Sequence, residues 1–332
     1  MKTFGKWLLI FLCVILVVYF AGPSPKKPAY SNALPVVPSI DSLEAYIDSS
    51  ERKHTLKRDN QARIVWVDSS RTATEYAIVY LHGFSASQGE GDPVHRHIAS
   101  TFGCNLYLSR LAEHGIDTVD QLIGLTPDNY WESAKEALMI GSKLGKKVIL
   151  MGTSTGGTLA LQLAATYPER VHALILYSPN IEINDPNAWL LNNPWGLQIA
   201  RLVKGGRYHD PDDTTANYLK YWNKPYRLEA LVALQHMLES SMNKQMFSAI
   251  RQPVFMAYYF KDEQHQDPVV KVSAMKRMFE QLATPPVLKK SVAISTAGDH
   301  VMGSRYKSKD TLAVMMKTNQ FMREVLQMRP RP

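Results

Sequence analysis

Residues 147–166 read KVILMGTSTGGTLALQLAAT, and this stretch decides the fold. An apolar run at Lys147–Met151 leads into Gly152-Thr153-Ser154-Thr155-Gly156, and a helix-forming run follows. This strand–turn–helix context around G-x-S-x-G predicts a nucleophile elbow. Such a turn strains the serine backbone, so the residues two positions before and after it must be small. The serine hydroxyl is then exposed at a helix N-terminus, where the helix dipole favours negative charge. Ser154 is therefore the predicted nucleophile.

Strands and helices alternate on both sides of this stretch. Further strands are predicted at 62–67, 76–81, 105–108, 173–177, 254–260 and 291–295, and further helices at 130–144, 273–283 and 311–327. Short apolar strands separated by helices indicate an α/β fold with a mostly parallel sheet and helices on both faces. In such sheets, ligands bind outside the carboxyl ends of the strands.

Residues 183–245 interrupt this alternation. They contain several tryptophans, tyrosines and leucines but no strand-like run. An insertion of this length is too long for an ordinary loop. We expect a small helical cap at about 183–245 within a domain that spans 41–332. The alternative is a set of ordinary extra helices on the flank of the sheet.

The N-terminus contains one long apolar run, Trp7–Ala21, after a basic flank. Such a run is either an uncleaved membrane anchor or a cleaved secretory signal. Bulky Tyr19 and Phe20 adjoin the one candidate cleavage site, so the pattern favours a single transmembrane anchor at 1–25. The catalytic domain would then lie outside the cytoplasm, and secretion after cleavage is the alternative. Five prolines between positions 22 and 38 indicate a stiff linker at 26–40.

Composition sets broad limits on function. The 332 residues are 45% hydrophobic and 20% charged, which is typical of a globular protein and excludes a disordered or collagen-like chain. The formal net charge is +8, but the basic residues are scattered. Scattered charge indicates solvated faces, and no nucleic-acid partner is expected. Cys13 and Cys104 are too few for a disulfide framework.

A nucleophilic serine needs a base and donors for the oxyanion. The HGF sequence at 82–84 ends the predicted strand 76–81, and its glycine permits a sharp turn. The backbone N–H groups of Phe84 and Thr155 are therefore the expected oxyanion donors. His300 follows the last predicted strand and is the candidate base, whereas His82 is expected to orient its loop.

Two aspartates compete for the place of the acid. Asp262 stands where strand 254–260 ends, and Asp267 begins the sequence DPVV at 267–270. The valines that follow the acid should pack just behind it and fix its direction, which favours Asp267. The chain order is then serine, aspartate, histidine, an order that occurs in catalytic triads.

From about Thr74 to the C-terminus, the chain resembles the α/β-hydrolase superfamily, in particular its capped serine esterase and monoacylglycerol-lipase-like branch. The resemblance rests on HGF (82–84), GTSTG (152–156), DPVV (267–270) and GDH (298–300), and it departs from the family at 261–267, which looks like an insertion. It implies an eight-stranded-type sheet, no cofactor, and hydrolysis of carboxylic esters through an acyl-enzyme.

These observations predict a serine hydrolase with the triad Ser154, His300 and Asp267. The cap aromatics favour a small-molecule or lipid-like ester with a medium-length acyl chain. A serine peptidase or acyltransferase is the alternative on the same fold, and a membrane-tethered binding module is the non-enzymatic one. The histidines at 95–97 and the HDPDD sequence at 209–213 are interpreted as surface loops, so no metal site is predicted.

Overall fold

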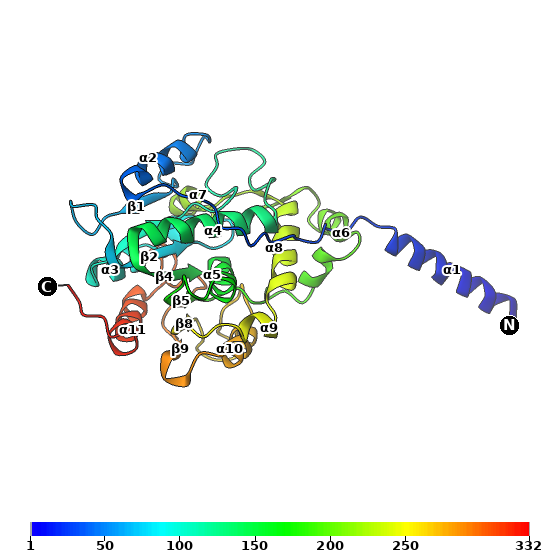
Figure 1. The fold of residues 1–332 in the computed structure, drawn as a ribbon. Coiled ribbons are helices and arrows are strands. Elements are labelled where there is room, and N and C mark those ends of the chain that lie inside the picture. Colours follow the sequence, from blue (N-terminus) through cyan, green and yellow to red (C-terminus); the bar gives the residue numbers. More distant parts are fainter. Residues whose placement is uncertain (1, 332) are drawn as a thin grey trace.

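A seven-stranded sheet forms the centre of the structure, a computed structural model that describes residues 2–331 and the side chains of residues 4–331 (Figure 1). Its strands lie in the order β1 (Arg63–Val65), β3 (Asn105–Leu108), β2 (Thr74–Leu81), β4 (Gly145–Thr153), β5 (Ala173–Tyr177), β8 (Val254–Tyr258) and β9 (Lys289–Ala293). β1 is antiparallel to β3, and the other neighbours are parallel. The predicted fold class is confirmed, although the central sheet in the described residues has seven strands rather than being of the eight-stranded type.

Helices cover both faces of the sheet. The helices around it are α2 (Ile40–Glu51), α3 (Val94–Thr101), α4 (Pro127–Leu144), α5 (Thr155–Thr166), α10 (Val272–Gln281) and α11 (Thr311–Glu324). Along β2, Val79 and Leu81 join the core that α4 and α5 cover. Ile78 and Tyr80 join the opposite core, beneath α3 and α11. This alternation follows from the period of two along a strand.

The segment between β5 and β8 is mainly helical, as expected for 183–245. It contains η2 (Ala188–Asn192), α6 (Gly196–Val203), β6 (Tyr208–His209), α7 (Ala216–Tyr221), β7 (Tyr226–Arg227), α8 (Leu228–Ser241) and α9 (Lys244–Phe247). The short antiparallel pair β6–β7 was not expected. Strands of two residues are too short to produce a period-two hydrophobic pattern, so the sequence carries no sign of them.

The interpretation of residues 95–97 as a surface loop is wrong, because they lie on α3. His95 is fully buried: its Nε2 lies 2.8 Å from the Gln88 carbonyl oxygen, and its ring packs edge-on against Tyr80. Burial lowers the pKa of His95 to about 3, so the imidazole is neutral. Among the residues that the structure describes, no group of three or more His, Cys, Asp or Glu side chains is arranged to hold a metal ion.

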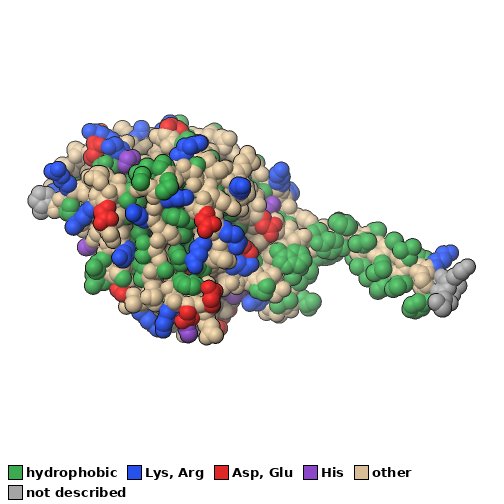
Figure 2. Space-filling view, turned by 90° about the horizontal axis from the view of Figure 1, so that it is seen from below, with side chains coloured by type: hydrophobic (Ala, Val, Ile, Leu, Met, Phe, Trp, Pro, Cys, Tyr) green, Lys and Arg blue, Asp and Glu red, His purple; other side chains and the backbone are tan. Residues whose placement is uncertain are grey.

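At the N-terminus, α1 (Lys2–Phe20) projects away from the rest of the protein (Figure 1), and its apolar side chains are exposed on the face seen in Figure 2. Within the described part of the chain, no helix is both long and apolar enough to cross a membrane. This finding does not support the anchor predicted for residues 1–25. The extracytoplasmic location of the catalytic domain stays a prediction. Met1 and Pro332, at the outer ends of the predicted divisions, lie outside the described residues.

The proline-rich segment has no helix or strand, and part of it is bound to α4 (Figure 1). Lys135 of α4 is fully buried, and its Nζ donates hydrogen bonds to the carbonyl oxygens of Ser31 (2.8 Å) and Ala33 (2.6 Å). The indole N–H of Trp131 donates to the same Ser31 oxygen at 2.9 Å. The predicted linker is therefore extended, but it belongs to the folded domain rather than acting as a free spacer.

Replacing Lys135 tests this attachment. Lys135→Met keeps most of the side-chain volume but removes the donor to the Ala33 carbonyl and one of the two donors to the Ser31 carbonyl. A buried group left unsatisfied costs about 1–3 kcal/mol. We expect a lower urea midpoint and faster proteolysis within residues 26–39. Lys143→Met on the same helix is the control, since that side chain is partly exposed. Equal urea midpoints for the two variants would contradict the assignment.

Candidate active site

Ser154 lies in a tight turn between β4 and α5. Its backbone has φ 52° and ψ −120°, a positive-φ conformation that a residue with a side chain rarely adopts. A Cβ atom on Gly156 would lie 1.9 Å from the Leu81 carbonyl oxygen, and one on Gly152 would lie 2.5 Å from the Gly156 carbonyl. Both glycines are therefore required by close backbone approach, as the G-x-S-x-G pattern predicts.

Neighbouring backbone groups hold this turn in place. The Ser154 N–H donates to the Tyr177 carbonyl oxygen at the end of β5, at 2.9 Å. The Ser154 carbonyl oxygen in turn accepts a hydrogen bond from the Asn180 N–H, also at 2.9 Å. The strained residue is thus fixed by the adjacent strand, which leaves its side chain directed at the cavity above the sheet.

His300 is paired with Asp267. The His300 Nδ1 lies 2.7 Å from Asp267 Oδ2, and both side chains are buried. The other carboxylate oxygen accepts hydrogen bonds from the N–H groups of Val269 (2.9 Å) and Val270 (3.0 Å). The valines of the DPVV sequence therefore do fix the direction of this carboxylate.

Asp262 lies elsewhere. Its side chain is exposed, and its Oδ1 lies 2.7 Å from the ring Nδ1 of its neighbour His265. An isolated antiparallel bridge between Phe260 and Gln266 closes residues 261–265 into a small loop. This loop accommodates the extra residues. The aspartate that meets His300 therefore comes five residues after Asp262, the position that counting from the end of the strand gives. The structure therefore brings Asp267, and not Asp262, to His300.

The two charges of this pair support each other. Burial by itself raises the pKa of Asp267, but the charge of His300 and the hydrogen bonds to the carboxylate outweigh it and hold that pKa below its usual value. Burial likewise lowers the pKa of His300, yet Asp267, with smaller contributions from Glu90 and Asp299, raises it above its usual value. The site can therefore stabilise a proton on this imidazole.

The loop after β2 is held by two histidines. His82 Nε2 accepts a hydrogen bond from the Leu111 N–H at 3.0 Å, and its Nδ1 lies 2.9 Å from the Gly83 carbonyl oxygen. Burial lowers the pKa of His82 to about 4, so it is neutral, with both ring nitrogens engaged. His114, which sequence reasoning missed, accepts from the Ser85 N–H at 3.0 Å. His82 therefore orients the loop that carries the Phe84 N–H.

A cavity of about 470 Å³ opens above Ser154 and His300. Cap residues contribute a largely apolar wall, made by Ala188, Leu191, Tyr218, Trp222, Tyr226, Leu231 and Leu234. Two polar residues near the nucleophile, Glu90 and Asn180, also line it. Sequence reasoning missed both, because an isolated Glu or Asn in a loop carries no motif. The cavity can hold a small apolar molecule with its reacting group beside Ser154.

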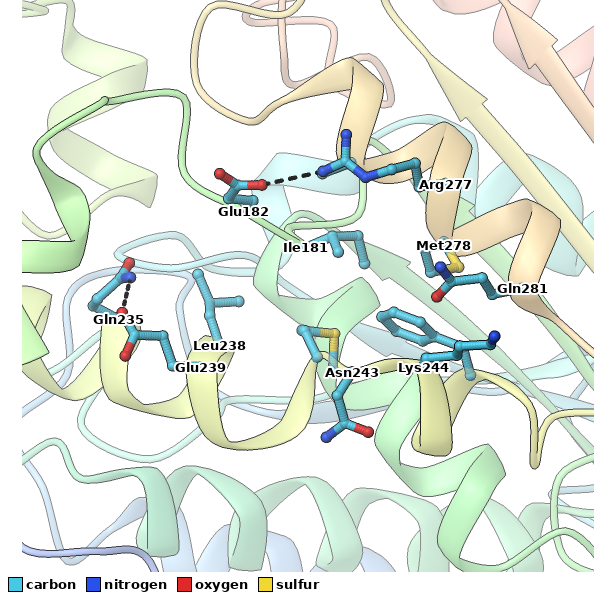
Figure 3. Close-up of a pocket in the computed structure, with 13 residues that line it drawn as sticks. Ile181, Glu182, Gln235, Leu238, Glu239, Asn243, Lys244, Arg277, Met278 and Gln281 are labelled. Atoms are coloured by element: carbon cyan, nitrogen blue, oxygen red, sulfur yellow. Dashed lines mark hydrogen bonds and ion pairs between the residues drawn. The ribbon is translucent and has the colours of Figure 1, made fainter.

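A second cavity, of about 340 Å³, lies between α8, α9 and α10 (Figure 3). Leu238 and Met278 lie beside it, and at its edge Gln235 is hydrogen-bonded to Glu239 and Glu182 is paired with Arg277 (Figure 3). None of the predicted catalytic side chains lines this cavity. It is therefore separate from the cavity at Ser154.

Comparison with known proteins places this geometry in a family. The family model described as alpha/beta hydrolase fold matches residues 128–311, which include Ser154, Asp267 and His300. The chain belongs to this family, and the predictions of its superfamily and of a hydrolase enzyme are confirmed. No curated protein matches the sequence.

Solved structures share the fold at low sequence identity. One comes from work on LipS and LipT, two metagenome-derived lipolytic enzymes; it is 14% identical with a TM-score of 0.64, over 81% of this chain and 99% of that one. The monoacylglycerol lipase of Paleococcus ferrophilus is 13% identical with a TM-score of 0.54, over 78% and 98%. Est1E from Butyrivibrio proteoclasticus, solved with ferulic acid, is 15% identical with a TM-score of 0.53, over 80% and 95%.

The two aspartates give opposite predictions. Asp267→Asn removes the charge that holds the His300 ring, and loss of an orienting carboxylate costs about 10⁴ in kcat. Asp262→Asn changes only an exposed loop and should stay within about twofold of wild type. Turnover of a p-nitrophenyl ester measures both variants. A larger loss in the Asp262 variant would reverse the assignment of the acid.

Proposed function

We propose that the protein is a serine hydrolase that cleaves carboxylic esters through an acyl-enzyme. Ser154 is the nucleophile, His300 the general base and Asp267 the acid that orients and stabilises it. The observation that carries the proposal is the buried 2.7 Å hydrogen bond from Asp267 to His300, a histidine that lines the same cavity as Ser154. A base oriented by a carboxylate beside a strained serine is the arrangement that activates a hydroxyl group.

The reaction proceeds in two proton-coupled halves. Ser154 Oγ attacks the ester carbonyl carbon while His300 Nε2 takes its proton, and the carbonyl oxygen gains negative charge. The N–H groups of Phe84 and Thr155 stabilise this oxyanion. The C–O bond to the alcohol then breaks, and His300 returns the proton to the leaving alkoxide. Water repeats the sequence on the acyl-enzyme, which releases the carboxylic acid and restores Ser154.

The shape of the cavity favours a medium-length acyl chain. Phe84 packs edge-on against Tyr226 with ring centroids 5.2 Å apart, and Tyr218 stacks on Trp222 at 5.1 Å, so the wall near the nucleophile is rigid and aromatic. Leu231 and Leu234 extend this apolar surface along α8. An acyl chain that enters this space loses water from apolar surface on both sides, which supports a lipid-like ester as the substrate class.

Removing the nucleophile tests the reaction. Ser154→Ala should lower kcat by a factor on the order of 10⁶, as in other triad knockouts. The same variant should lose covalent labelling by a fluorophosphonate probe. Ser142→Ala, at a partly exposed serine of α4, is the matched control and should react like wild type. Retention of most ester hydrolysis in the Ser154 variant would refute the proposal.

Chain length tests the substrate class. Each buried methylene contributes about 0.8 kcal/mol, so the butyryl ester should exceed the acetyl ester by about tenfold in kcat/KM. A series of p-nitrophenyl esters measures this, and Leu231→Trp, which fills part of the cavity, should reduce the advantage of the longer chains. Preference for acetyl esters would contradict an acyl pocket. Faster turnover of aminoacyl anilides than of any ester would favour the peptidase alternative.

A further inference from the structure

A second buried acid lies beside the proposed catalytic groups. Glu90 belongs to the short helix η1 (Gln88–Gly91), and only 2% of its surface is exposed. It lines the same cavity as Ser154 and His300. The reaction described above needs one carboxylate, which Asp267 provides. A second carboxyl group in this place therefore calls for a role of its own, since burying it without one is costly.

The carboxyl group of Glu90 is fixed against the loop that follows β2 and carries Phe84, here called the oxyanion loop. Its Oε2 accepts hydrogen bonds from the Gly83 N–H at 2.5 Å and from the Tyr80 hydroxyl at 3.3 Å. A Cβ atom built on Gly83 would lie 2.6 Å from Glu90 Oε1 and 3.0 Å from the Ser154 Cβ. Glu90 Oε1 and the nucleophile therefore lie on the same side of Gly83. Within the described chain, Oε1 accepts no hydrogen bond.

The Tyr80 hydroxyl links this carboxyl group to the elbow itself. It also lies 3.0 Å from the Thr153 hydroxyl, on the residue that precedes Ser154. Glu90 thus contacts the oxyanion loop directly and the elbow through one intervening side chain. Both partners are buried, so these contacts persist in the folded protein.

The groups around Glu90 decide what its charge does. The titratable groups that interact electrostatically with it are Tyr80 of β2, Tyr130 of α4, Tyr218 of α7 and His300, and His95 of α3 packs against Tyr80. Burial raises the pKa of Glu90 to about 7, although the Gly83 N–H, His300 and Tyr80 act in the opposite direction. Of the groups in this set, His300 is the one that becomes a cation during the reaction, so it is the natural partner of the Glu90 charge.

We propose that Glu90 is a positioning residue that holds the Gly83 end of the oxyanion loop and, as a carboxylate, stabilises the protonated form of His300. The proposal rests on the proposed function and deepens it. Glu90 neither gives nor takes a proton in the reaction, and the proton passes between Ser154 Oγ and His300 Nε2 as before. The imidazolium would thus lie between two acids, with Asp267 bonded to Nδ1 and Glu90 on the side of the nucleophile.

The charge has a consequence for the pH dependence. A base must be neutral to accept a proton, so the reaction rate rises with pH as His300 loses its proton. A carboxylate that stabilises the imidazolium moves this rise to higher pH. Removing the charge of Glu90 should therefore move this rise, the acid limb of the pH profile, to lower pH. The shift should be smaller than the roughly 1 unit of a full close charge, because a carboxyl group with a pKa of about 7 is partly protonated over the limb. Because the two groups interact, the limb reports the pair rather than either residue.

Glu90→Gln separates the charge from the hydrogen bond, because the amide oxygen still accepts from the Gly83 N–H. The rate of Ser154 labelling by a fluorophosphonate probe is measured between about pH 5 and 9, a readout that does not depend on knowing the substrate. We expect the acid limb of the variant to lie at lower pH than that of wild type, by a fraction of the roughly 1 unit that a fully ionised neighbour gives. An unchanged limb in a folded Glu90→Gln protein overturns the proposal, since a purely structural acceptor would leave it in place.

Two further variants complete the test. Glu90→Ala removes the acceptor as well, so it should show the same shift of the limb together with a further loss of labelling rate, and it replaces Glu90→Gln if that protein does not fold. Asp262→Asn removes an exposed charge and should leave the limb unchanged. If wild type is labelled normally and the Glu90 variants have the same acid limb as wild type, the role of Glu90 is refuted but the proposed function is not. Failure of wild type to label at Ser154 would overturn the proposed function itself.

Discussion

The backbone contact between the turn at Ser154 and the end of β2 is the constraint on which the site depends. Gly156 lies so close to the Leu81 carbonyl group that no side chain fits between them. The contact places the loop that starts at His82 directly beside the nucleophile, and hydrogen bonds from Gly83 and Ser85 then fix that loop. The parallel pairing of β2 with β4 brings the two turns to the same sheet edge.

The surroundings of each buried histidine decide whether its ring can carry a charge. The ring nitrogens of His82 and the Nε2 of His95 are satisfied by backbone groups, and burial keeps both rings neutral. His300 differs because the carboxyl groups of Asp267, Glu90 and Asp299 raise its pKa, so it alone among these rings is poised to carry a proton. Neighbours rather than residue type thus distinguish a structural histidine from one that can act as a base.

The sequence predicted those elements and side chains that depend on residues close to them in the chain. The elbow at Ser154 follows from two glycines at fixed spacing, and Asp267 follows from the valines whose N–H groups bind its carboxylate. The helix α3 was not predicted, because one of its buried residues is a histidine and this polar residue interrupts the apolar pattern of a helix. The place of Glu90 in the site was not predicted for a different reason. Tertiary packing brings Gly83, Tyr80 and His300 to it, and no local sequence pattern indicates such packing.

The indole of Trp195 joins parts of the chain that lie far apart in sequence. Its ring N–H donates to the Val18 carbonyl oxygen, and its backbone N–H donates to that of Pro23. Trp195 is the N-cap of α6, and the C-cap, Lys204, lines the cavity. The two ends of α6 therefore connect α1 with the cavity wall. A cap that swings outward must therefore drag the projecting helix with it or break these two bonds. The orientation of α1 and the width of the cavity are therefore coupled through Trp195, so that fixing one of them limits the other.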